Sequence, residues 1–90
     1  MIPENGSAQK LGTLRKGQRG WIVSVAPSAD DQLTRRILEM GIVEGSLIEV
    51  MHEAPFGGDP IAVRVRGALI AIRRSEANLI FVQPEPLPNG

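Results

Sequence analysis

The run from Ile61 to Arg66 alternates apolar and charged side chains more regularly than any other part of the chain. Ile61, Val63 and Val65 fall on one side, and Arg64 and Arg66 fall on the other. A period of two predicts a β-strand with one buried face. The preceding residues 55 to 60 (PFGGDP) hold two prolines and two glycines. A run of such turn residues between two strand-like segments predicts a hairpin, and therefore an antiparallel sheet.

Further strand-like segments lie at residues 21–25, 44–54, 68–74 and 80–83. In the second of these, Ile48 and Val50 are expected to face one way, with Glu49, Met51 and Glu53 facing the other. Cross-strand ion pairs between these glutamates and the arginines of the next strand are therefore expected.

One segment has helical periodicity. Leu33, Ile37 and Met40 recur at the spacing of a single apolar stripe, so residues 28–41 predict a helix. Ser28 or Asp30 is the expected N-cap, and Gly41 is the expected end of the helix. A shorter helical turn is predicted at residues 75–79, with Ser75 as its cap.

The 90 residues suit a single domain. The predicted order is strand, helix, three strands, helical turn and strand, which indicates a mainly β fold, a small bent antiparallel barrel with a helix inserted between the first two strands. Residues 1–10 are predicted to be a flexible tail, residues 11–84 the folded domain, and residues 85–90 a flexible proline-rich tail.

Composition excludes several function classes. Ten basic and ten acidic residues cancel, which argues against nucleic acid as a partner. Base stacking would need more aromatic residues than one tryptophan and two phenylalanines. No apolar run approaches the ~20 residues that span a bilayer, and residues 1–10 are not expected to be a secretory signal. A cytoplasmic protein without membrane insertion is predicted.

The glycine-containing loop is interpreted as structural. Gly57 and Gly58 are adjacent and no lysine follows, unlike in a phosphate-binding loop. At least one of them is expected to need positive φ. Asp59 is expected to accept from nearby backbone amides, and Pro60 to hold Asp59 extended. Phe56 is the only aromatic residue expected to be exposed.

No catalytic residue is predicted, because no serine has a general base at a recognisable offset and the chain has no cysteine. The chain is therefore not expected to be an enzyme. His52, Glu53 and Asp59 are the candidate metal ligands, but a single histidine with scattered acids has no ligand spacing. No metal site and no cofactor are predicted.

Arg35, Arg36 and Leu38 lie off the apolar stripe of the predicted helix. One interpretation is that the arginines form a solvated face and that Leu38 packs under the 41–46 loop. The other is that the three residues form a protein-binding surface, with Phe56 at the loop tip as a second candidate contact. The sheet edge beside residues 80–83 is the alternative contact.

From Leu11 to Pro84 the chain resembles the FeoA family, ferrous iron transport protein A. The resemblance rests on RRILEMGI, on the loop APFGGDP and on RRSEA, in this order and spacing. Glu44 departs from the proline that family members often carry. The resemblance implies an SH3-like barrel and an accessory or regulatory role through contact with the FeoB permease and its cytosolic G-protein domain. It also relates the chain to the C-terminal module of iron- and manganese-dependent repressors.

A second hypothesis belongs to another class. The protein would itself bind ferrous iron or another transition metal and act as a carrier. His52 and the nearby acidic residues are its only support in the sequence.

Overall fold

The computed structural model describes residues 8–28 and 30–85. They form six strands, two α-helices and one short 3-10 helix: β1 (Gln9–Lys10), η1 (Leu11–Thr13), β2 (Arg19–Val25), α1 (Asp31–Glu39), β3 (Leu47–Glu53), β4 (Ile61–Val65), β5 (Ala68–Ile72), α2 (Arg74–Ala77) and β6 (Ile80–Pro84).

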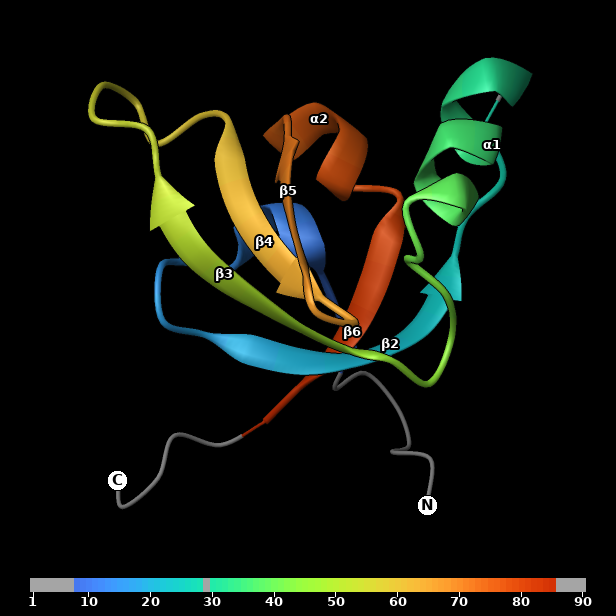
Figure 1. Cartoon of the computed structure of the whole chain (residues 1–90), viewed down its shortest axis with the longest axis horizontal. Helices are drawn as coiled ribbons and strands as arrows, with labels where there is room; N and C mark the ends of the chain where they lie inside the picture. The colour runs from blue at the N-terminus through green and yellow to red at the C-terminus, as the bar shows by residue number, and fades with distance from the viewer. Residues whose placement is uncertain (1–7, 29, 86–90) are drawn as a thin grey trace.

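All neighbouring strands are antiparallel, and the sheet order is β1-β6-β2-β3-β4-β5. Figure 1 shows the sheet strongly curved, with α2 near one end of the curved sheet and α1 set to one side. The predicted mainly β, SH3-like fold is confirmed. The helix α1 lies between β2 and β3, which are the first two long strands, because the short β1 precedes them.

The core is aliphatic, and every helix and strand except β1 contributes a residue to it. Ile37 of α1 and Val63 of β4 are fully buried, as their periodicity predicts. The other buried apolar residues are Leu11, Leu14, Ile22, Ile42, Ile48, Val50, Ile61, Val65, Ile72, Ala77, Ile80 and Val82.

The helix α1 begins and ends as its sequence predicts. The side chain of Asp30 accepts hydrogen bonds from the backbone N–H groups of Gln32 and Leu33. Gly41 follows the helix with φ of 89°, a conformation that glycine adopts without steric cost.

A β-bulge in β3 changes which side chains face the core. Val50 pairs with Val63 and His52 pairs with Ala62, so Met51 is an extra residue on this strand. Beyond the bulge Glu53 lies opposite the buried Ile61 and shares its face. The predicted placement of Glu53 on the outer face is therefore wrong, because one inserted residue reverses the side-chain alternation.

Other expectations also need correction. Arg73, not Ser75, is the N-cap residue of α2, and its backbone N–H donates to Glu76. The strand of residues 80–84 is not a sheet edge, because β6 lies between β1 and β2.

The tail boundaries shift as well. Gln9 and Lys10 pair with β6, and Glu85 bonds Arg19. Gln9, Lys10 and Glu85 were all predicted to lie in the tails. The remaining tail predictions, for residues 1–7 and 86–90, lie outside the described residues.

Replacing Ile37 with alanine should lower the free energy of unfolding by about 2–4 kcal/mol, because it removes buried methyl groups and leaves a cavity. Leu38→Ala is the control on the same helix, since Leu38 is 48% exposed. Urea denaturation of both variants tests the assignment of the core stripe. Equal losses in the two variants would contradict it.

Candidate functional site

The connection between β3 and β4 is a compact loop with an aromatic tip. The backbone N–H of Ala54 donates to the carbonyl of Pro60 at 3.1 Å and closes the loop. Gly57 and Gly58 have φ of 80° and 69°, which confirms the predicted need for positive φ. Phe56 is 91% exposed. The loop therefore presents an apolar side chain to solvent on a backbone conformation that glycine adopts without steric cost.

Arg74 of α2 forms hydrogen bonds with this loop. Its Nε donates to the carbonyl of Gly58 at 2.8 Å, and its backbone N–H donates to Oδ1 of Asp59 at 2.9 Å. Its Nη1 donates to the carbonyls of Gly12 and Leu14 at 2.9 and 2.8 Å. A single side chain thus connects the loop, η1 and the residue following η1. Among the described residues, Oδ1 of Asp59 accepts from the distant backbone N–H of Arg74 and not from the nearby amides that its place in the loop predicts.

Glu53 completes this cluster at the end of β3. Its carboxylate accepts from the backbone N–H of Lys16 at 2.6 Å and forms ion pairs with Arg15 and Arg74 at 3.0 and 3.3 Å. The hydrogen bond from Lys16 lowers the pKa of the Glu53 carboxyl from its ordinary value. Burial opposes this shift, and the charges of Arg15 and Arg74 add to it.

Space beside Glu53 explains the second glycine of the loop. A Cβ on Gly58 would lie 2.9 Å from Oε1 of Glu53, whereas a Cβ on Gly57 would meet no atom within 4 Å. Gly58 therefore serves both conformation and close packing, and Gly57 serves conformation alone. The structural role predicted for the loop rests on these contacts.

The second predicted surface lies on α1. Arg35 is exposed and Leu38 is 48% exposed. Arg36 forms an ion pair with Glu76 of α2 at 3.2 Å, so part of its function is to connect the two helices. Of the predicted helix residues, Arg35 and Leu38 are the ones whose substitution leaves the described contacts intact.

The candidate metal ligands do not form a ligand cluster. His52 is exposed on β3, whereas Glu53 faces the arginine cluster and Asp59 bonds the backbone of Arg74. Among residues 8–28 and 30–85, no three side chains of histidine, cysteine, aspartate or glutamate come together.

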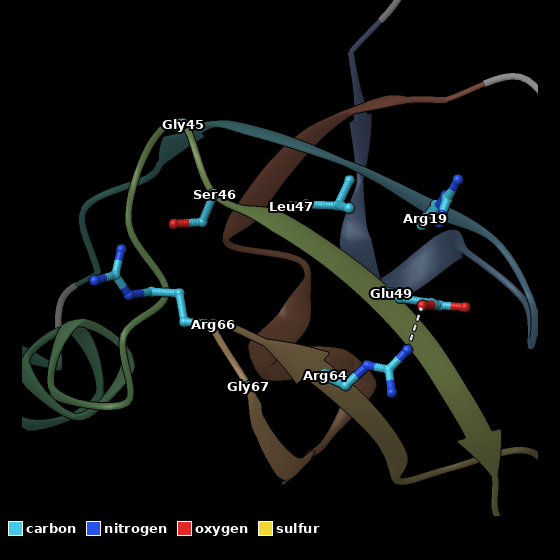
Figure 2. A pocket seen from close by; sticks show the side chains of 8 residues that line it. All are labelled: Arg19, Gly45, Ser46, Leu47, Glu49, Arg64, Arg66 and Gly67. Atoms are coloured by element: carbon cyan, nitrogen blue, oxygen red, sulfur yellow. Dashed lines mark hydrogen bonds and ion pairs between the residues drawn. The ribbon is translucent and has the colours of Figure 1, made fainter.

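An open groove of about 480 Å³ crosses the outer face of the sheet, between the turns that hold Gly45 and Gly67. Arg64 forms the predicted pair with Glu49 at 3.2 Å, and Arg19 pairs with Glu85 at 3.0 Å. Figure 2 shows Arg66 directed away from the Glu49–Arg64 pair, toward α1. Two of its three arginines are neutralised by these ion pairs, and we assign no ligand to the groove.

Two exposed apolar residues were missed in the sequence. Trp21 is 48% exposed, so Phe56 is not the only exposed aromatic residue, and Leu69 of β5 is 62% exposed. Trp21 precedes a bulge at residues 22–24 of β2, and Leu69 lies opposite Arg64 on the outer face. The exposure of Leu69 could have been predicted, because Arg64 alternates with buried valines and Leu69 is its partner on the neighbouring strand.

The described chain has no helix long and apolar enough to cross a membrane. Its charged side chains bind one another and the backbone, and apolar side chains project from a loop, a helix and a strand. These features define a small SH3-like domain. The family model described as FeoA domain matches residues 9–84, and the chain belongs to the FeoA family, which is associated with ferrous iron transport.

Solved structures agree with this assignment. A FeoA-like protein from Clostridium acetobutylicum is 32% identical, with a TM-score of 0.76 over 92% of this chain and 91% of that one. FeoA from Stenotrophomonas maltophilia, complexed with zinc, is 31% identical, with a TM-score of 0.75 over 86% of this chain and 95% of that one. It is described as a prokaryotic SH3-domain protein and a possible ferrous iron transport activating factor.

A manganese-dependent transcriptional repressor in complex with manganese is 27% identical over 90% of this chain but only 38% of its own, with a TM-score of 0.77. Among curated proteins, none matches this chain.

The Glu53 cluster predicts a specific pH dependence. Because folding lowers the pKa of Glu53 from 4.5, its stabilising effect is complete above that pH and is lost as the pH falls through the folded-state value. The difference in unfolding free energy between wild type and Glu53→Gln should therefore shrink as the pH falls below 4.5. Chemical denaturation at a series of pH values measures it, with Glu49→Gln as the control for loss of one carboxylate. A difference that stays constant with pH would contradict the assignment.

Proposed function

We propose that this protein is a cytoplasmic accessory protein of ferrous iron uptake that acts by contact with the cytosolic, G-protein-containing part of a FeoB-type permease. Membership of the FeoA family supports the link to ferrous iron transport. The observation that carries the proposal is Phe56, which is 91% exposed at the tip of a loop fixed by Arg74. Exposed aromatic residues on a rigid support are favourable contact points in protein interfaces.

The helix α1 supplies a second candidate contact through Leu38 and Arg35. Leu38 is a half-exposed apolar residue beside an exposed guanidinium, which is a combination common in interfaces. Arg36 points to another side of the helix, where it pairs with Glu76 of α2. In this account the protein has no catalytic role and works by presenting these side chains to the permease.

The carrier hypothesis has weaker support. A closed shell around ferrous iron needs several oxygen or nitrogen ligands directed at one point. Glu53 is already bound by Arg15, Arg74 and the backbone of Lys16, so recruiting it to a metal would break those contacts. Contact with the permease is the function that we favour.

Titration of the protein against the cytosolic domain of its cognate permease, with GDP and with a GTP analogue, tests the proposal. Phe56→Ala or Leu38→Ser should weaken binding by at least about 1.5 kcal/mol, roughly tenfold. Each variant controls for the other, since they lie on separate surfaces and outside the core. If both variants remain folded and bind as wild type does, both proposed contacts are wrong.

A further inference from the structure

The strand β5 forms an open edge of the sheet. It is the last strand in the order β1-β6-β2-β3-β4-β5 and pairs with β4 alone. Within the described part of the chain, no backbone hydrogen bond outside that pairing involves residues 68–72. Alternate residues of an edge strand direct their N–H and C=O groups away from the neighbouring strand. β5 therefore offers backbone donors and acceptors to another chain.

The features that usually protect an edge are missing from β5. Its sequence, ALIAI, holds no charge and no proline, and its register with β4 is free of bulges. Leu69 is 62% exposed. Proteins normally block such edges with lysine, proline or a bulge, because an unprotected apolar edge pairs with other strands. An edge left open in this way is suited to strand addition.

A groove lies at the end of β5, where the strand approaches α1 and α2. The groove has a volume of about 360 Å³ and is lined by Ala71, Ile72 and Arg73, with Arg36 of α1, Pro60 and Glu76 as its other walls. On the side of β5 that faces the core, Ile72 is buried and Ile70 is partly buried against the core. Apolar side chains of an added strand would extend this core.

Charge distinguishes between two possible binding partners of this edge, a second copy of the chain and a segment of another protein. Arg66 and Arg73 flank β5, are exposed, and form no ion pair among the described residues. If two copies paired antiparallel about Ile70, Arg66 of each copy would lie close to Arg73 and Arg74 of the other. Like charges in adjacent strands are destabilising, so a second copy is disfavoured. A segment with acidic residues at both ends is complementary.

We propose that β5 accepts an extended segment of a partner protein as an added strand, and that this segment has an apolar centre flanked by acidic residues. Backbone hydrogen bonds along residues 68–72 supply the pairing. Arg66 and Arg73 select the acidic flanks and set the register. This surface is separate from Phe56, so the proposal stands independently of contact with the permease.

A synthetic peptide tests the proposal directly. The probe has roughly nine residues, with alternating valine and threonine in the centre and aspartate and glutamate at both ends. Its control carries lysine at both ends. Titrated into the full-length ¹⁵N-labelled protein, the acidic peptide should shift the amide signals of residues 68–72 and protect alternate ones from exchange. The basic peptide should bind at least about fivefold more weakly.

Variants separate strand addition from other modes of binding. Leu69→Lys should abolish binding, whereas Leu38→Lys, a matched change at an exposed leucine of α1, should not. Arg66→Asp combined with Arg73→Glu should reverse the preference to the lysine-flanked peptide. Absence of β5 shifts at millimolar peptide, shifts confined to the Phe56 loop, or self-association of the protein that Leu69→Lys abolishes would each overturn the proposal.

Discussion

The loop that carries Phe56 depends on the contacts of one side-chain group, the guanidinium of Arg74. It bonds carbonyls of Gly58, Gly12 and Leu14 and pairs with Glu53, so three regions far apart in the sequence (residues 12–14, residues 53–58 and α2) meet at one side chain. The arrangement requires the bulge at Met51, which turns Glu53 inward. It also leaves little space at position 58, where a Cβ would lie 2.9 Å from Oε1 of Glu53. A fork of fixed donors can satisfy several carbonyls at once, which a lysine ammonium cannot do with the same geometry.

This cluster connects the fold with the proposed function. A 90-residue domain has a small core, and its loops would ordinarily be the least ordered part. Here the loop that carries Phe56 is tied to α2 and η1, so Phe56 projects from a fixed backbone. Ordering that is complete before binding reduces the entropic cost of association. The chain thus combines a rigid loop tip, a half-exposed helix and an unprotected sheet edge within one small barrel.

Local patterns in the sequence were sufficient for much of the fold. The alternation around Val63, the stripe through Ile37, the cap at Asp30 and the glycines of the loop each predict the structure that is found, because each depends on near neighbours in the chain. The placement of Glu53 could not be predicted, since a bulge changes a face without changing composition. The contacts of Arg74 with Gly12 and Leu14 span about 60 residues, which no local pattern encodes.

The measurement that tests the account most directly is ¹⁵N relaxation at Gly57 and Gly58 in Arg74→Lys, with Arg73→Lys as the matched control. Arg73 is exposed and its side chain makes no hydrogen bond among the described residues, so its replacement should leave the loop ordered. The account predicts lower order parameters at both glycines in Arg74→Lys and unchanged values in the control. Order parameters equal to those of wild type in a folded Arg74→Lys protein would show that the loop does not depend on this arginine.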